Sequence, residues 1–376
     1  MRITLVTETY FPQVNGVSRT LGSLVETTVK SGHQVQLIIP RYPDPVKGSN
    51  GVQVVDFPGL ALPFYREILL PVVPSGKLGR ILRDFDPDVI HIATEGTLGL
   101  SALKAARRLQ VPVVSSYHTN FPQYLKHYRM GWLEPGSRGY LRWFHNRTGC
   151  TLVPTREMSD RLIKNGFYNV DVWSRGIDTR MFNPSRRDPD LRKMMGVEEG
   201  DTAFLYVGRL APEKNLMMMI KAFDSLSGSV PVKLILVGDG PYRRELEKKG
   251  DPRMFLAGYR YGKELAALYA SSDIFVFPSL TDTFGNVMQE AMACGLPVIA
   301  FDITGPRSVV RNFETGLLAG DVSEESLSTA MERVAANGDL RHVLAEGALE
   351  FARTREWDRV NSVCLKWYEK LAEFRG

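Results

Sequence analysis

The sequence has few cysteines and no long apolar runs. Cys150, Cys294 and Cys364 are odd in number and far apart, so we expect reduced thiols and no disulfide framework. No apolar stretch reaches eighteen residues, so we expect no transmembrane helix. The first residues, Met1–Val6, read as a strand without a signal-peptide pattern. Together these features predict a cytoplasmic protein.

Two further signatures are missing. Gly238-Asp239-Gly240 is not a full dinucleotide fingerprint after a first strand, which sets a dehydrogenase aside. No nucleic-acid module accompanies the basic residues, so we expect no nucleic-acid partner. The 376 residues are 44% hydrophobic and 24% charged, with a formal net charge of +5. This length and composition predict two globular α/β domains, each with its own core.

The most informative segment runs from Phe275 to Ala300. An apolar run stops at Pro278, a polar loop holds Asp282, and a helical pattern begins at Phe284-Gly285-Asn286, with Glu290 inside it. A second apolar run then follows, so the segment reads as a strand–loop–helix–strand crossover. Such a loop directs N–H groups and a helix start at an anion. Two acids beside those amides suit a nucleotide sugar; the alternative is ordinary surface or capping carboxylates.

A second segment places cations after a strand end. The apolar run 203–208 ends at Gly208, and Arg209 and Lys214 follow it. Because the carboxyl ends of parallel strands line the ligand crevice, both cations are candidates for phosphate binding. The alternative is a solvated turn with a surface ion pair to Glu213.

These motifs, in this order, resemble those of the retaining nucleotide-sugar glycosyltransferases of family 4. The resemblance rests on Gly208-Arg209 with Lys214, the segment Thr281–Ala291, Thr7–Val17, and Ser116-Tyr117-His118-Thr119. It covers almost the whole chain and is strongest to the branch that holds bacterial α-mannosyltransferases and sulfoquinovosyl or glycosyl lipid synthases. One departure is that Asp282 stands where the family usually has glutamate.

The resemblance implies a GT-B fold: two facing Rossmann-like α/β domains with parallel sheets and a cleft between them. We expect an acceptor domain over 1–180, a donor domain over 181–356, and a final helix within 357–376 that returns to the first domain. The prolines and charges of 177–200 predict an interdomain linker.

The resemblance also assigns roles. Arg209, Lys214 and the N–H groups near 284–287 would stabilise the leaving diphosphate. Asp282 would contact sugar hydroxyls, and Glu290 the ribose. His118 would lie by the sugar and acceptor, although a core histidine satisfied by the backbone is the alternative. The implied catalytic residues are His118, Arg209, Lys214 and Asp282. The implied donor-binding residues are Gly16, Gly208, Gly258, Thr283, Phe284, Gly285, Asn286, Val287 and Glu290.

No metal or other cofactor is expected. Asp84, Asp86 and Asp88 alternate in a way that superficially suggests a divalent-ion site, but nothing ties them to the donor-binding half, and a solvated turn is favoured. The cations Arg209 and Lys214 can neutralise the negative charge of the diphosphate, as a metal ion does in other enzymes. Retention of configuration is implied by the family and not by any spacing in the sequence.

Basic and aromatic residues are interleaved from 123 to 147. The cations there are Lys126, Arg129, Arg138, Arg142 and Arg147, against the single acid Glu134. This mixture suits an anionic membrane surface, and a helix pair with solvated cations is the alternative. Pro63–Arg66, predicted to lie in a long loop, is a second candidate for contact with the bilayer or the acceptor.

The sequence therefore predicts transfer of a hexosyl group, mannosyl or glucosyl in type, from GDP-mannose or a UDP-hexose. The acceptor would be a membrane lipid or a lipid-linked glycan at the cytoplasmic face of the membrane. A nucleotide-sugar epimerase of the same fold and a catalytically silent nucleotide-sugar sensor are the alternatives.

Overall fold

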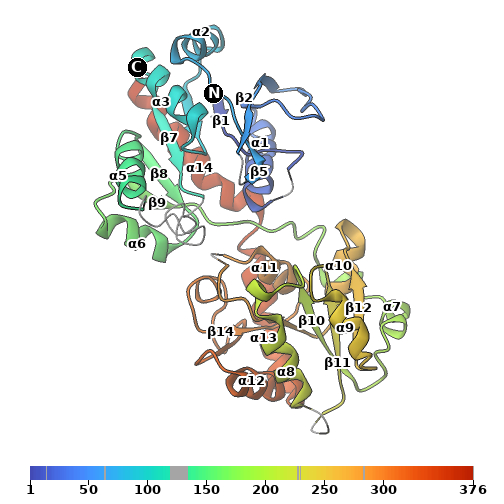
Figure 1. The fold of residues 1–376 in the computed structure, drawn as a ribbon. Helices are drawn as coiled ribbons and strands as arrows, with labels where there is room; N and C mark the ends of the chain where they lie inside the picture. Colours follow the sequence, from blue (N-terminus) through green and yellow to red (C-terminus); the bar gives the residue numbers. More distant parts are fainter. Residues whose placement is uncertain are drawn as a thin grey trace. The chain divides into compact units, whose positions relative to one another are not determined.

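The computed structural model describes residues 1–13, 15–62, 65–118, 134–226, 228, 230–282 and 284–375. Contacts divide the chain into two compact units (Figure 1). Unit 1 contains Met1–Gly176 and Trp357–Gly376, and unit 2 contains Ile177–Glu356.

Unit 1 is built on a parallel sheet. In the described residues its strands are ordered β3-β2-β1-β6-β7-β8-β9, and β4 and β5 form a separate antiparallel pair. The strands are β1 (Arg2–Val6), β2 (Gln34–Pro40), β3 (Val52–Phe57), β4 (Leu60–Leu62), β5 (Tyr65–Leu70), β6 (Val89–Ile92), β7 (Val113–Ser116), β8 (Cys150–Val153) and β9 (Val170–Val172).

Helices cover both faces of this sheet. They are α1 (Gly16–Lys30), α2 (Ser75–Phe85), α3 (Thr97–Leu109), α5 (Glu134–His145), α6 (Arg156–Lys164) and α14 (Trp357–Ala372), which the short turn η5 (Glu373–Arg375) extends. Leu24 of α1 and Val360 of α14 pack in one core, whereas Leu82 of α2 and Leu98 of α3 pack in the other. The C-terminal helix α14, red in Figure 1, thus lies against the N-terminal helix α1, and Asn361 donates to Thr27 between them.

Unit 2 repeats this architecture with the strand order β12-β11-β10-β13-β14-β15 in its described residues. The strands are β10 (Thr202–Val207), β11 (Val232–Val237), β12 (Met254–Gly258), β13 (Ile274–Phe277), β14 (Val298–Phe301) and β15 (Gly316–Ala319). Side chains of β10 alternate between two cores, as a strand covered on both faces requires. Leu205 packs in one core and Phe204 in the other.

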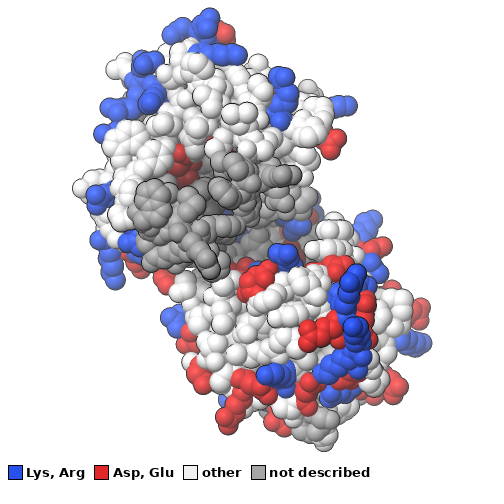
Figure 2. Space-filling model, in the orientation of Figure 1, with Lys and Arg blue, Asp and Glu red and all other residues white. Residues whose placement is uncertain are grey.

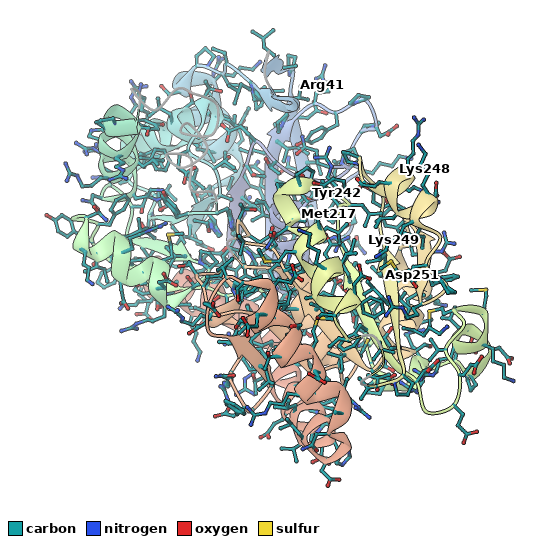
Figure 3. The ribbon with its side chains drawn as sticks, turned by 60° about the horizontal axis from the view of Figure 1, so that its bottom comes forward. Arg41, Met217, Tyr242, Lys248, Lys249 and Asp251 are labelled. Atoms are coloured by element: carbon teal, nitrogen blue, oxygen red, sulfur yellow. The ribbon has the colours of Figure 1, made fainter. Side chains whose placement is uncertain are left out.

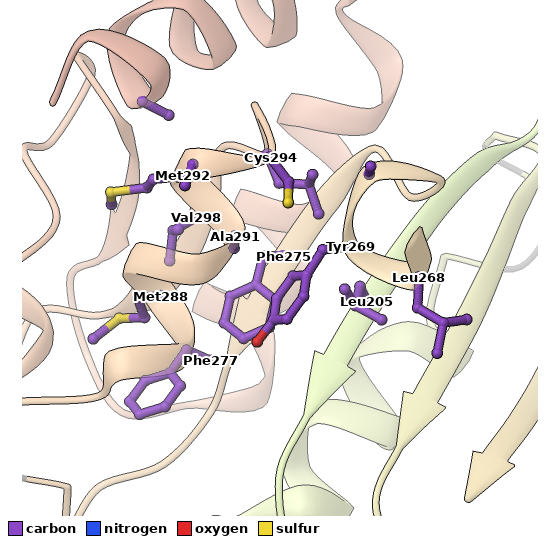
Figure 4. Packing of buried hydrophobic residues seen from close by; sticks show 14 of the residues in the cluster. Leu205, Leu268, Tyr269, Phe275, Phe277, Met288, Ala291, Met292, Cys294 and Val298 are labelled. Carbon is purple, nitrogen blue, oxygen red and sulfur yellow. The ribbon is translucent and has the colours of Figure 1, made fainter. Parts of the chain in front are cut away.

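The helical elements of unit 2 cover both faces of its sheet. They are η2 (Pro184–Arg186), α7 (Pro189–Met194), η3 (Pro212–Lys214), α8 (Leu216–Asp224), α9 (Arg243–Lys249), α10 (Gly262–Ala270), α11 (Asn286–Ala293), η4 (Pro306–Ser308), α12 (Glu324–Ala336) and α13 (Gly338–Arg353). Figure 4 shows the first core, where Met288 and Met292 of α11 lie near Val298 of β14 and Phe277 of β13.

Two sequence predictions about loops are wrong. Residues 177–200 are not a linker, because they lie in unit 2 and form η2 and α7, each begun by an N-cap and a proline. Arg187 and Arg192 of this segment both bind Asp273. Tyr65 and Arg66 begin β5 and do not lie in a loop, while Pro63 and Phe64 fall outside the described residues.

Candidate functional site

The strand order of unit 2 reverses between β10 and β13. From β10 the chain continues to one side of the sheet through β11 and β12, and from β13 to the other side through β14 and β15. In open parallel sheets the ligand crevice lies at the carboxyl ends of the strands beside such a reversal. Lys214 follows β10 and Asp282 follows β13, so the two sequence motifs converge at this position.

Lys214 and Asp282 form an ion pair. The Nζ of Lys214 lies 2.7 Å from Oδ1 and 2.8 Å from Oδ2 of Asp282, and both side chains are partly buried. Two further hydrogen bonds join the same loops: Asn215 donates to the carbonyl of Pro278, and Thr281 donates to the carbonyl of Glu213. The cation expected at phosphate and the acid expected at sugar hydroxyls therefore neutralise one another here.

Arg209 is placed differently. Its guanidinium is largely exposed and pairs with Glu213 at 3.3 Å, which is the surface ion pair considered above as the alternative. The backbone of Arg209 is held by a hydrogen bond, because the buried Tyr206 hydroxyl donates to the Arg209 carbonyl at 2.9 Å. Tyr206 has no role in the sequence analysis, and its position before Gly208 is the signal that could have found it.

Gly285 sets the start of α11. Its φ of 71° lies in the left-handed region, and a Cβ there would lie 2.7 Å from Met288 Cε and 3.0 Å from Phe277 Cζ. No side chain caps α11, so the N–H groups of its first turn, which include those of Asn286 and Val287, remain suited to an anion. Phe284 is buried in the core, and Thr283 lies outside the described residues.

Glu290 lies deeper on α11. Its side chain is 6% exposed, and its Oε2 accepts a hydrogen bond from the Tyr269 hydroxyl at 3.0 Å. Tyr269, on α10, is another residue that sequence reasoning missed. Burial, and secondarily the charge of Glu290, raises the pKa of the neighbouring Cys294 thiol, which agrees with its interpretation as a small buried residue.

Glycines join the ends of three strands at the same edge. The Gly208 N–H donates to Val237 O, and the Gly238 N–H donates to Gly258 O. A Cβ at Gly238 would lie 2.0 Å from the carbonyl oxygen of Gly208, so no larger residue fits this approach. Gly208 and Gly258 therefore lie at the edge that carries Lys214. Sequence reasoning missed Gly238 as a third member.

The sheet of unit 1 reverses between β1 and β6, and Glu8 occupies that position. Glu8 is 3% exposed, and its carboxylate accepts from Thr94 Oγ1 and from the N–H groups of Leu98 and Gly99 in α3. Burial raises the pKa of Glu8 above its ordinary value, and these hydrogen bonds oppose the rise. A protein carboxylate thus already occupies the N-terminus of α3. Sequence reasoning assigned Glu8 no role, although it stands in the quoted Thr7–Val17 motif.

Gly16 is the first residue of α1. The preceding Asn15 caps this helix, since its Oδ1 accepts from the N–H groups of Val17 and Ser18. Gly16 therefore lies where the loop from β1 enters a helix, as its motif predicts.

His118 follows the end of β7. Its Nδ1 lies 3.0 Å from an NH2 of Arg175, and its buried Nε2 has no hydrogen-bond partner among the described residues. Burial, and secondarily Arg175, lowers the pKa of His118 well below its ordinary value. The lowered pKa favours a neutral imidazole, and within the described residues no backbone group satisfies the His118 ring.

Comparisons with known proteins agree with this geometry. Residues 14–181 match the family model described as Glycosyltransferase Family 4, and residues 188–351 match the model described as Glycosyl transferases group 1. The chain is 38% identical to a GDP-mannose-dependent alpha-mannosyltransferase of Mycobacterium tuberculosis, over 85% of this chain and 83% of that protein. It is 29% identical to an alpha-monoglucosyldiacylglycerol synthase of Streptococcus pneumoniae, over 97% of this chain and 86% of that protein.

Among solved structures, sucrose-phosphate synthase from Thermosynechococcus elongatus shares the fold, with a TM-score of 0.77 and 19% identity over 98% of each chain. The order of the motifs, the two parallel sheets and the family matches agree with one another. This chain is a nucleotide-sugar-dependent glycosyltransferase that belongs to family 4 and has the GT-B fold.

Proposed function

We propose that the protein transfers a hexosyl group, with retention of configuration, from a nucleoside diphosphate sugar to a membrane lipid or a lipid-linked glycan. The observation that carries the proposal is the Lys214–Asp282 pair at the β10–β13 reversal, beside the uncapped start of α11. A transferase is favoured over the epimerase and the silent sensor because the relatives described above are a transferase and a synthase.

Departure of the diphosphate develops negative charge on its oxygens. Fixed positive groups aimed at that charge are usually the largest catalytic contribution. Lys214 releases Asp282 and binds the diphosphate. The first N–H groups of α11 and the exposed Arg209 also stabilise the negative charge of the diphosphate. Asp282, released from Lys214, accepts hydrogen bonds from sugar hydroxyls, and Glu290 accepts from the ribose.

Retention follows from a front-face displacement. The bond from the anomeric carbon to the phosphate oxygen breaks, and a bond from that carbon to the acceptor oxygen forms on the same face. The acceptor's hydroxyl proton passes to the leaving phosphate oxygen. His118 is a neutral hydrogen-bonding group in this scheme and removes no proton, which agrees with its lowered pKa. The charge on the diphosphate is met by Lys214 and Arg209, so no metal or other cofactor is proposed.

The donor and acceptor classes come from the relatives' names. A GDP-mannose-dependent relative supports GDP-mannose as donor, with a UDP-hexose as the second candidate, and a diacylglycerol-modifying relative supports a lipid acceptor. None of the helices in the described ranges is both long and apolar enough to cross a membrane. We propose that contact with the cytoplasmic face of the membrane is peripheral.

The charge of unit 1 supports that contact. Unit 1 carries 25 Lys and Arg against 16 Asp and Glu, whereas unit 2 carries 22 against 26. Figure 2 shows mostly blue charged side chains on the visible face of unit 1 and mixed colours on unit 2. On α5, Arg142 and Trp143 are exposed, and Arg147 stacks on the Trp143 ring at 4.4 Å. Residues 123–133 of the predicted basic segment lie outside the described residues.

The test is release of nucleoside diphosphate from a panel of GDP-, UDP- and ADP-sugars, with and without lipid extract. Release from one donor that rises only with lipid, together with a lipid product of retained configuration by NMR, is the expected result. Donor binding without release or transfer for any pairing would overturn the proposal in favour of the silent sensor. Sedimentation with vesicles rich in anionic lipid tests the membrane contact, and equal sedimentation with neutral vesicles would contradict the proposed role of charge.

A further inference from the structure

Arg175 is a buried cation that has no counter-ion in the part of the chain that the structure describes. Its side chain is 6% exposed, and one NH2 group donates to His118 Nδ1 at 3.0 Å. Among the described residues, the other terminal nitrogen is buried without a hydrogen-bond partner, and no carboxylate pairs with Arg175. Burial lowers the pKa of Arg175 to about 10, which leaves the guanidinium charged at neutral pH. An unpaired buried charge is strongly destabilising, so a fold retains one where something else supplies its partner.

The surroundings hold Arg175 in place. Arg175 follows β9 after Trp173, which is 1% exposed and donates from its indole to Asn361 of α14. The next residue, Gly176, lies so close to Trp357 that a Cβ there would be 2.5 Å from its ring. Trp173 also contacts His118, with 5.6 Å between ring centroids. The guanidinium therefore has few positions open to it and is preorganised beside His118.

The contact fixes the tautomer of His118. A guanidinium has donors only, so the Nδ1 that faces Arg175 must accept and carries no proton. The proton of the neutral ring is then on Nε2, the buried nitrogen without a partner. Arg175 and His118 consequently each present one N–H donor group that has no acceptor within the described ranges.

We propose that Arg175 and His118 together bind an oxyanion of one substrate, distinct from the donor diphosphate that Lys214 and Arg209 meet: a carboxylate, a phosphate or a sulfonate on the sugar or on the acceptor. The inference rests on the proposed transferase function and narrows its substrate class, because a neutral hydroxyl would leave the Arg175 charge uncompensated. Arg175 is also a positioning residue, since it holds the His118 proton on Nε2.

Binding can be tested without turnover. Histidine ¹⁵N chemical shifts of the full chain report the His118 tautomer, and inorganic phosphate and sulfate serve as probes. We expect a protonated Nε2 in the wild type, and a shift of the His118 signals on addition of either anion. Arg175→Gln should give a mixture of the two His118 tautomers. It should also raise, at least tenfold, the anion concentration that half-shifts the His118 signals. Arg175→Lys keeps the positive charge but loses the planar bidentate guanidinium, so it should restore only part of the anion affinity.

The matched control is Arg156→Gln, which removes an exposed arginine of the same unit and should leave every His118 signal unchanged. A wild-type His118 protonated on Nδ1, or an anion response that survives Arg175→Gln in a folded protein, would overturn the proposal. Circular dichroism establishes folding of each variant. These measurements need no donor or acceptor, so their failure is distinguishable from a failure of the transferase assay.

Kinetics then identify the substrate that carries the oxyanion. Initial rates are compared for donors with a neutral or an acidic sugar, and for acceptors with a neutral or an anionic headgroup. We expect Arg175→Gln to raise KM at least tenfold for one anionic substrate and to change KM for its neutral analogue less than twofold. The substrate whose KM rises, donor or acceptor, is the one whose oxyanion binds Arg175 and His118. An equal effect on charged and neutral substrates would overturn the oxyanion assignment.

Discussion

Lys214 and Asp282, 68 positions apart in the sequence, share a bidentate ion pair with N–O distances of 2.7 and 2.8 Å. Each is expected to bind a different part of the donor, but in this structure the two side chains bind one another. The pair holds both side chains at the β10–β13 reversal and avoids the cost of a partly buried unpaired charge. In the proposed function the diphosphate binds Lys214, so donor binding would break the pair and Asp282 would compete with the diphosphate for Lys214.

Asp282→Asn should therefore strengthen nucleoside diphosphate binding while it lowers turnover. Loss of the competing carboxylate frees Lys214, and a partly exposed pair is worth about 1 kcal/mol, or roughly fivefold in affinity. Calorimetry with GDP and UDP measures the first effect, and sugar transfer measures the second. Asp224→Asn, which removes a carboxylate that pairs with Lys249 and Arg253 elsewhere in unit 2, is the control (Figure 3 labels Lys249). Weaker diphosphate binding by Asp282→Asn would contradict the competition.

Lys214→Ala should lower turnover by about a hundredfold or more, by analogy with removal of one oxyanion donor. The reason is that its ammonium is proposed to stabilise the negative charge that develops on the leaving diphosphate. Lys249→Ala removes a cation of the same type, bonded to Asp224 at 2.6 Å, and should change turnover less than about twofold. Turnover of Lys214→Ala within a factor of three of wild type would refute this role.

The sequence predicted the two-sheet fold, because short apolar runs that end in glycine or a polar loop mark buried parallel strands. It also identified Lys214 and Asp282 as candidates. It could not show that they touch, since that contact depends on strand order and not on sequence spacing. The error at 177–200 has a local cause. Pro184 and Pro189 begin short helices there, but proline beside charged residues has the same composition as a linker.

Arg175 was missed for another physical reason. Burial of a cation is rare, so an arginine in a polar stretch is assigned to the surface by default. Only the packing of Trp173 and Trp357 around the residues next to it shows otherwise.

Tyr269→Phe should weaken donor binding more than it slows chemistry. The lost hydroxyl donates to Glu290 at 3.0 Å and orients a carboxylate proposed to bind the ribose, which does not change during the reaction. Loss of such uniform binding raises KM and leaves kcat nearly unchanged. We expect KM for the donor to rise about fivefold, the cost of one hydrogen bond of about 1 kcal/mol. Tyr168→Phe, at an exposed tyrosine in unit 1, is the control. A fall in kcat at constant KM would exclude a ribose-orienting role.

Gly285→Ala should destabilise unit 2 by about 2 to 4 kcal/mol. The left-handed backbone at a φ of 71° costs about 1 to 2 kcal/mol for a residue with a Cβ, and the contacts with Met288 and Phe277 add overpacking. Gly200→Ala separates the two causes, because its φ is 90° and a Cβ there would meet nothing within 4 Å. Urea unfolding of both variants measures the difference. Equal losses would show that the contacts around Gly285 relax without cost.

Glu8→Gln should stabilise unit 1 at neutral pH, and the gain should fade as the pH is lowered. Burial raises the pKa of Glu8 above its ordinary value of 4.5. A carboxyl whose folded pKa is raised contributes its stability below the unfolded pKa and loses it as the pH rises through the folded pKa. The amide cannot ionise, and its Oε1 can still accept from the N–H groups of Leu98 and Gly99. Thermal unfolding from about pH 4.5 to about pH 8 should therefore show the variant's Tm rising relative to wild type.

Glu26→Gln is the control for this pH series, because Glu26 is exposed on α1 and pairs with Lys30 at the surface. Its Tm difference from wild type should stay within about one degree across the series, since exposed pairs contribute little. A Glu8→Gln variant that loses stability relative to wild type as the pH rises would show that the pKa of Glu8 is lowered in the folded protein. The hydrogen bonds from Thr94 and the start of α3 would then outweigh burial, and Glu8 would act as an ionised cap of that helix.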